Sequence, residues 1–328
     1  MEHPAGAPPI AGAWQRLAAF IIDIVLLAIV GMLLGLVLYD VFAGLGVRGL
    51  LIGFVIAIAY FGALNSRLCD GQTFGKMIMK IRVVGRDGTP LGLPASLGRS
   101  TLVCIPWFLN GAPLDMELLT SWPGVVASFL TIGLGLAILY LFVFNRRTRQ
   151  SVHDLAVGSC VVKSDTAAAP LSLPPIWRGH FAGLVLVGGL AAGLPVLTGQ
   201  IAQSEMFGPL LELQQTMLKE PGVLNAGVHS GKSIHYADET STTTTDLQLQ
   251  VYLATNDIEN ETFANRIAQL ALEGYPEADR TDVIMVSLAY GYDIGIASAW
   301  SSQSYTFPPE EWRQRLTATP GTRPLPGR

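Results

Sequence analysis

The sequence predicts an α-helical polytopic membrane bundle of about five spans, joined to a small α+β soluble domain with the element order αββαββ. Half of the 328 residues are hydrophobic and only 14% are charged, and the mean hydropathy is +0.42. Such values are unusual for a soluble protein of this length. Long apolar runs occupy the first 200 residues, whereas polar and apolar positions alternate in the remainder.

Charge divides the chain at about the same place. Residues 1–200 contain 13 Lys and Arg against 9 Asp and Glu, a net of +4. Residues 201–328 contain 8 against 16, a net of −8. A basic apolar part and an acidic polar part indicate that the two occupy different solvents. Neither part is basic enough to indicate a nucleic-acid-binding protein.

Crossing the hydrocarbon core of a bilayer takes about 20 apolar residues in a helix. Five stretches meet or approach this requirement: 17–39, 47–65, 95–112, 122–144 and 179–199. The third is the doubtful one, because it carries Arg99 near its start and Pro106 in its middle. It either spans the membrane or forms an interfacial or re-entrant helix.

Loop charge favours a span at 95–112. The segment 66–99 holds six Lys and Arg, and the segment 145–178 holds five. The positive-inside rule places both in the cytoplasm, so an even number of crossings must separate them. The loop 110–121 between them carries Asp115 and Glu117 but no Lys or Arg, as an outside loop should. Five spans then leave the N-terminus cytoplasmic and the C-terminal domain extracytoplasmic.

The predicted organisation follows from these spans. It consists of a membrane module (1–163), a cytoplasmic linker (164–178), a fifth transmembrane helix (179–199), an extracytoplasmic α+β domain (200–318) and a disordered tail (319–328). Between spans two and three, the strand-like 79–84 and the Asp-Gly turn at 85–88 predict a β-hairpin at the membrane surface. In the soluble domain, periodicity predicts helices at 204–220, 258–273 and 308–316 and strands at 223–236, 242–254, 282–292 and 294–307.

Two ionisable residues in the first span are functional candidates, because charge inside a bilayer is costly. Arg16 and Asp23 are seven residues apart, which places them on one helix face but about 10 Å apart along the axis. Each therefore needs another partner. For Arg16 the choices are a lipid phosphate, reached by snorkelling, or Asp154 at the same face of the membrane. A buried Asp23 could bind a cation or carry a proton, or it could fix helix packing through a structural hydrogen bond.

Two cytoplasmic segments carry further candidates. His153 and Asp154 follow the basic run that ends span four, and topology alone does not explain Asp154. The loop Gly71-Gln-Thr-Phe-Gly75-Lys76 ends span two. Its glycines would let backbone approach a phosphate, but their spacing fits neither a P-loop nor a Rossmann turn. A structural turn is the favoured interpretation.

Taken together, these segments resemble the RDD family, which is named for one arginine and two aspartates in a membrane module. The resemblance covers roughly residues 10–163. It rests on Arg16 to Asp23, Gly71 to Lys76 with Lys80-Ile-Arg-Val-Val and Asp87-Gly88, then Arg99, and finally Gln150-Ser-Val-His153-Asp154-Leu. The family triad maps onto Arg16, Asp23 and Asp154, with Gly71, Gly75, Lys76, Arg99 and His153 as supporting residues. Span five and the acidic domain look like additions to the module.

The resemblance implies a multi-pass protein of the bacterial inner membrane. Transport, including sodium/proton exchange, has been proposed for such proteins, and Asp23 would then be the ion or proton site. One departure is that Asp23 is the only carboxylate within a predicted span, whereas exchangers usually need more. The alternative to an antiporter is a non-enzymatic protein whose residues 201–328 bind an envelope partner, with the module as anchor and a homodimer as one assembly.

Nothing in the sequence indicates an enzyme, a metal site or another cofactor. The motifs HExxH, GxSxG and CxxC are absent. Cys69, Cys104 and Cys160 lie at no metal-ligand spacing and are interpreted as small buried hydrophobic residues. The Tyr-, Trp- and Ser-rich segment 289–307 is a candidate contact surface for a partner, or a sheet edge covered within the fold.

Overall fold

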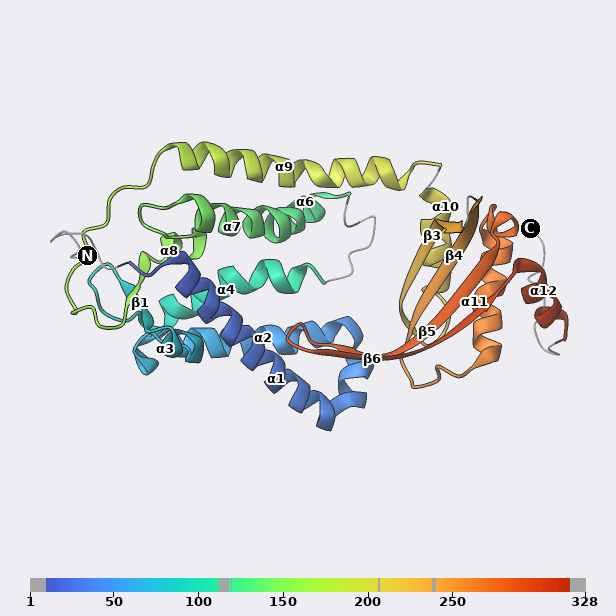
Figure 1. Ribbon diagram of the computed structural model, residues 1–328, viewed down its shortest axis with the longest axis horizontal. Helices are drawn as coiled ribbons and strands as arrows, with labels where there is room; N and C mark the ends of the chain where they lie inside the picture. The colour runs from blue at the N-terminus through green and yellow to red at the C-terminus, as the bar shows by residue number, and fades with distance from the viewer. Residues whose placement is uncertain (1–9, 112–117, 119, 206, 238–239, 319–328) are drawn as a thin grey trace. The chain divides into compact units, whose positions relative to one another are not determined.

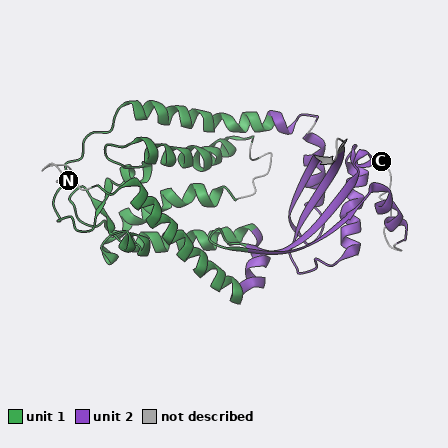
Figure 2. Ribbon diagram, in the orientation of Figure 1, with its two compact units in different colours: residues 1–37, 47–199, 293–298 green, residues 38–46, 200–292, 299–328 purple. Residues whose placement is uncertain are grey.

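The computed structural model describes residues 10–318, apart from 112–117, 119, 206 and 238–239 (Figure 1). The chain forms two compact units (Figure 2). Unit 1 comprises residues 1–37, 47–199 and 293–298, and unit 2 comprises residues 38–46, 200–292 and 299–328. The predicted disordered tail at 319–328, as well as Asp115 and Glu117, lie outside the described residues.

Long apolar helices dominate unit 1. They are α1 (Ala13–Leu45), α2 (Gly49–Leu64), α4 (Leu93–Leu109), α6 (Trp122–Ser128), α7 (Leu134–Phe144) and α9 (Gly179–Ala202). The π-helical turn η3 (Phe129–Gly133) makes α6 and α7 continuous. The non-helical backbone of Leu38 (φ −116°, ψ 25°) kinks α1, and the division between the units falls at this kink.

Three helical stretches in the described part of the chain are long and apolar enough to cross a membrane. They are Ala13–Leu64, Trp122–Phe144 and Gly179–Ala202. The first contains α1 and α2, joined by the short helix η1 (Gly46–Arg48). Helix α4 is not among the three, so the predicted count of about five spans is not confirmed. α4 has only 17 residues, contains Pro106 and buries the charged Arg99.

The apolar side chains on these helices are exposed in a way that a soluble bundle would not tolerate. On α1, Leu36 is 81% exposed and Val37 is 82% exposed. On α9, Val185 is 76% exposed. Helices that are apolar all round belong either in a large core or in lipid. The exposure of these side chains therefore indicates helices that lipid surrounds.

A small two-stranded sheet and short helices occupy one end of unit 1. Strand β1 (Ile81–Gly85) pairs antiparallel with β2 (Ser159–Lys163). The predicted hairpin over 79–88 is therefore wrong, although the tight turn exists, with Gly88 at φ +80°. The turn leads into α4 instead of a second strand, because β2 supplies the apolar partners that bury β1. Two short helices, α3 (Phe74–Ile78) and α8 (Val152–Ala156), precede β1 and β2 respectively.

The C-terminal part of the chain has the predicted order αββαββ, followed by a helix. The elements are α10 (Gly208–Met217), β3 (Val223–Ala237), β4 (Thr240–Leu253), α11 (Glu261–Gly274), β5 (Val283–Asp293), β6 (Ser298–Phe307) and α12 (Pro309–Ala318). They form a four-stranded sheet in the order β3-β4-β5-β6. Strands β4 and β5 are parallel, so the chain between them crosses over through α11.

The core of unit 2 lies between its helices and one face of the sheet. Leu247, Leu249 and Val251 of β4 alternate with polar residues, as a half-buried strand requires, and are at most 1% exposed. They pack with helix residues such as Ile267 and Trp312. Asn260 caps α11 by accepting a hydrogen bond from the Phe263 N–H at 2.9 Å. The helix therefore begins at Glu261, three residues later than the start at 258 that its apolar periodicity predicts.

Candidate functional site

The carboxylate of Asp154 is the centre of a buried ion cluster. Asp154 lies at the third position of α8, where its Oδ2 accepts the N–H of Ser151 at 3.2 Å in a capping box. Arg99 of α4 donates to Oδ1 through Nε at 3.0 Å and through Nη2 at 2.8 Å. Arg16 of α1 donates to Oδ2 through Nη2 at 2.7 Å. One carboxylate thus joins three separate helices.

This cluster is almost entirely removed from solvent. The side chain of Asp154 is 0% exposed, and those of Arg16 and Arg99 are 9% and 7% exposed. Arg16 also donates to the carbonyl oxygen of Arg149, and its guanidinium lies 5.7 Å from the ring centroid of Phe142. The predicted approach of Arg16 to Asp154 is therefore present. Arg99, predicted only as a supporting residue, donates two hydrogen bonds to one oxygen of the carboxylate.

The charges around Asp154 decide its protonation. Burial alone would raise the pKa of Asp154, but Arg99, His153 and Arg16 hold it well below its ordinary value. Because the pKa is lower in the folded state, the stability that Asp154 contributes is present above the ordinary aspartate pKa. It is lost as the pH falls through the folded-state pKa. The ion cluster is therefore intact at neutral pH.

Asp23 makes no contact with this cluster and has a different set of partners. Its Oδ1 accepts the Tyr60 hydroxyl at 2.7 Å and the Gly75 N–H at 2.8 Å. Its Oδ2 accepts the Thr73 hydroxyl at 2.5 Å. Asp23 is 0% exposed. The carboxylate of α1 is thus held by one donor from α2 and two from the segment that begins α3.

The loop 71–76 is a structural turn in this arrangement. Gly71 adopts φ +72°, donates to the carbonyl oxygen of Ser66 at 2.8 Å, and leaves no room for a Cβ against the Val83 carbonyl. A Cβ on Gly75 would meet the carbonyl oxygen of Ala19 and, at 3.0 Å, the carboxyl carbon of Asp23. The second glycine therefore lets α3 approach α1 closely enough to bind Asp23.

Residues 10–158 match the model of the RDD family, and this range contains all three residues of the predicted triad. This part of the chain is an RDD-family module. Together with its apolar helices, the match makes the chain a membrane protein. The comparisons with curated proteins and with solved structures found no match for the chain.

The three residues of the predicted triad are thus divided between two places. Arg16 and Asp154 meet in the ion cluster, and Asp23 stands apart with its three donors. Two of these donors, Tyr60 and Thr73, were not among the residues predicted from the sequence. Thr73 carries a recognisable signal, because it is the N-cap residue of α3, whereas a single tyrosine in an apolar helix carries none.

Lys76 lies between the two groups of the RDD module. Its Nζ lies 3.4 Å from the Thr73 hydroxyl, and no carboxylate of the described residues lies within ion-pair distance of it. Burial lowers the pKa of Lys76 to about 7, and Arg99 and Arg16 add to the lowering, which Asp23 and Asp154 oppose. At neutral pH the amine therefore exchanges between its neutral form and its ammonium form, and an anion beside it would favour the ammonium form.

His153 is buried beside Asp154 and is uncharged at neutral pH. Burial lowers the pKa of His153 to about 3, against the attraction of Asp154 and with a further contribution from Arg99. Its Nε2 lies 3.5 Å from Asp154 Oδ2, and its Nδ1 has no hydrogen-bond partner among the described residues. Within the described part of the chain, no group of three His, Cys, Asp or Glu side chains is placed to hold a metal ion.

Proposed function

We propose that this RDD-family protein transports a small solute through its helix bundle, without catalysis, between two cavities. The first, called the tip cavity here after the turn at residues 293–298 that lines it, has a volume of about 710 Å³. Its other walls come from α4 and the α6–α7 helix. The basic cavity, of about 260 Å³, is lined by Arg16, Lys76, Arg99 and apolar side chains. Both cavities are lined by Gly135 and Leu139 of α7. This shared wall is the observation that carries the proposal.

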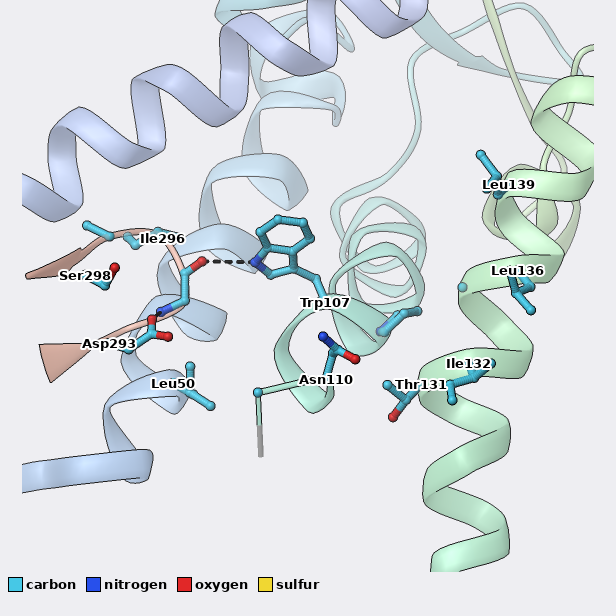
Figure 3. A pocket seen from close by; sticks show the side chains of 15 residues that line it. Leu50, Trp107, Asn110, Thr131, Ile132, Leu136, Leu139, Asp293, Ile296 and Ser298 are labelled. Carbon is cyan, nitrogen blue, oxygen red and sulfur yellow. Dashed lines mark hydrogen bonds between the residues drawn. The ribbon is translucent and has the colours of Figure 1, made fainter. Parts of the chain in front are cut away.

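The tip cavity has polar groups on opposite sides. Trp107 of α4 donates its indole N–H to the carbonyl oxygen of Gly295 at 3.0 Å (Figure 3). Asn110, directly after the end of α4, and Thr131, in the α6–α7 helix, also line this cavity (Figure 3). Thr131 lies in the π-helical turn η3, and such turns are frequent at functional sites. These groups suit a solute that is partly polar.

In this proposal, the hydrogen bonds of Asp23 hold α1 against α2 and α3, and Asp23 carries no ion. A cation site needs free carboxylate lone pairs or a hydrated cavity. Asp23 instead accepts three hydrogen bonds from the protein and is 0% exposed. Asp23 is also not among the residues that line either cavity. The sodium/proton antiporter that uses Asp23 is accordingly the less favoured function.

Cysteine labelling at the shared wall tests the path. In a background where Cys69, Cys104 and Cys160 are replaced by serine, Leu139→Cys is expected to react with a membrane-impermeant maleimide from both faces of proteoliposomes. Val185→Cys, on the exposed apolar surface of α9, is the control and is expected to react from neither face. Labelling of Leu139→Cys from one face only, or from none in a folded protein, excludes a path through this wall.

We also propose that unit 2 binds an envelope partner through the face of its sheet that its helices leave open. A hollow of about 330 Å³ on this sheet is lined by polar side chains that include His229, Gln248 and Ser287. Tyr252 and Trp300 form an aromatic pair with ring centroids 4.9 Å apart, and Trp300 is 47% exposed. Polar and aromatic groups together are typical of interfaces.

Photocrosslinking tests this partner-binding role. A photoreactive residue at position 250, which lines the hollow, is expected to form adducts with an envelope component. A lack of such adducts would contradict the role.

A further inference from the structure

The basic cavity carries more positive charge than its carboxylates neutralise. Arg16, Lys76 and Arg99 line it, and Asp154 accepts hydrogen bonds from both arginines. Lys76 adds a third positive charge when it is protonated, and among the described residues its Nζ lies within hydrogen-bond distance of the Thr73 hydroxyl alone, at 3.4 Å. A half-buried ammonium group without a counter-charge is costly, so an anion in the cavity would stabilise it.

The same cavity contains two buried polar atoms with no partner in the described part of the chain. They are Nδ1 of His153 and Oδ1 of Asn65, on residues that are 8% and 1% exposed. Nε2 of His153 faces the Asp154 carboxylate at 3.5 Å, so the proton of the neutral ring belongs on Nε2 and Nδ1 is an acceptor. Both orphaned atoms are therefore acceptors, and a hydroxyl-bearing ligand would satisfy them.

The remaining wall of the cavity is apolar and reaches the surface of the bundle. Leu17, Phe20, Phe61 and Phe142 line it, and Phe20 is 41% exposed among the lipid-facing side chains of α1. The volume of about 260 Å³ is slightly below that of typical small-molecule pockets, which start at about 300 Å³. It accommodates a head group, while an attached acyl chain would leave past Phe20 into the bilayer.

We propose that the basic cavity binds the head group of an anionic phospholipid whose head group carries hydroxyls, as in phosphatidylglycerol. The phosphate lies against Lys76 and the outer edges of Arg16 and Arg99. The head-group hydroxyls donate to His153 and Asn65, and the acyl chains follow Phe20 into the leaflet. Binding requires no passage between α4 and α7, so this proposal goes beyond transport and stands or falls separately from the labelling of Leu139→Cys.

Lipid binding to the full chain in detergent tests this site, measured by native mass spectrometry and by the thermal shift on lipid addition. Phosphatidylglycerol is expected to bind the wild type, and phosphatidylcholine is not. Lys76→Met is expected to bind phosphatidylglycerol about tenfold more weakly, because it loses one charge-assisted hydrogen bond. Lys80→Met removes an exposed charge from the same segment and is the matched control, expected to bind like the wild type.

Three results would overturn parts of the proposal. Equal affinity of the wild type and Lys76→Met for phosphatidylglycerol would exclude the basic cavity as the site. Equal affinity for phosphatidylmethanol, which has the same charge but no hydroxyl, would exclude His153 and Asn65 as hydroxyl acceptors. A thermal shift with free glycerol 3-phosphate as large as that with the lipid would assign the site to a soluble anion.

Discussion

Replacing Asp154 by alanine is expected to destabilise the RDD module by about 3–5 kcal/mol, the cost of leaving a buried charge without its partner. The change leaves the guanidinium groups of Arg16 and Arg99, 9% and 7% exposed, without their carboxylate. It also removes the capping box of α8. Unfolding of the full chain in nanodiscs, followed by denaturant titration, measures the loss.

The control for this change is Asp70→Asn, because Asp70 has a left-handed backbone (φ +52°) that asparagine tolerates and alanine does not. Asp70 pairs with Arg82 at 3.0 Å, but its side chain is 61% exposed. Solvent screens such a pair, so its removal is expected to cost less than about 1 kcal/mol. Losses of similar size for Asp154→Ala and Asp70→Asn would contradict the account of a buried cluster. In a double-mutant cycle, Arg99→Met and Asp154→Ala should cost less together than the sum of their separate effects, because they share one contact.

Gly75→Ala is expected to destabilise the packing of α3 against α1 and the binding of Asp23 there. The added Cβ would meet the carbonyl oxygen of Ala19, which belongs to backbone and cannot turn aside. Moving α3 away to relieve this overlap would break the Gly75 N–H bond to Asp23 Oδ1. Overpacking typically costs about 1–3 kcal/mol, and a lost hydrogen bond to a charged group adds about 1.5–3 kcal/mol.

Gly98→Ala provides the comparison. Gly98 lies inside α4, and nothing lies within 4 Å of a Cβ added there. Alanine favours helix by about 1 kcal/mol over glycine, so this variant is expected to be as stable as the wild type or more so. Thermal unfolding of both variants under the same conditions gives the result. If Gly75→Ala matches Gly98→Ala, α3 does not pack against α1 as described.

The residue pattern predicts several of the apolar helices and the order of the C-terminal elements, because both depend on local sequence, but it does not establish the number of spans. Apolar length alone marks α1, α2 and α9, and alternation marks β4. The pairing of β1 with β2 is different. It joins segments on either side of α4 and α7, and the local Asp-Gly turn after β1 favours a hairpin that the chain does not form.

For the candidate site, the sequence names Asp154 as one of two partners for Arg16, but it names no partner for Asp23. Arg16 and Asp154 are both predicted at the cytoplasmic ends of spans, and they do form an ion pair. The sequence leaves Asp23 open between an ion site and a packing contact, because its donors come from residues far along the chain. Tyr60 and Thr73 become visible only when α2 and α3 are packed against α1.

Cation flux in proteoliposomes tests most directly whether Asp23 fastens the helices or carries ions. The comparison is between wild type and Asp23→Asn under sodium, potassium and proton gradients. The amide of asparagine keeps an acceptor for Tyr60 and Gly75, so the variant is expected to fold. We expect the two proteins to show the same cation flux per folded molecule. Sodium or proton flux in the wild type that disappears in a folded Asp23→Asn would contradict the fastening role and establish Asp23 as an ion site.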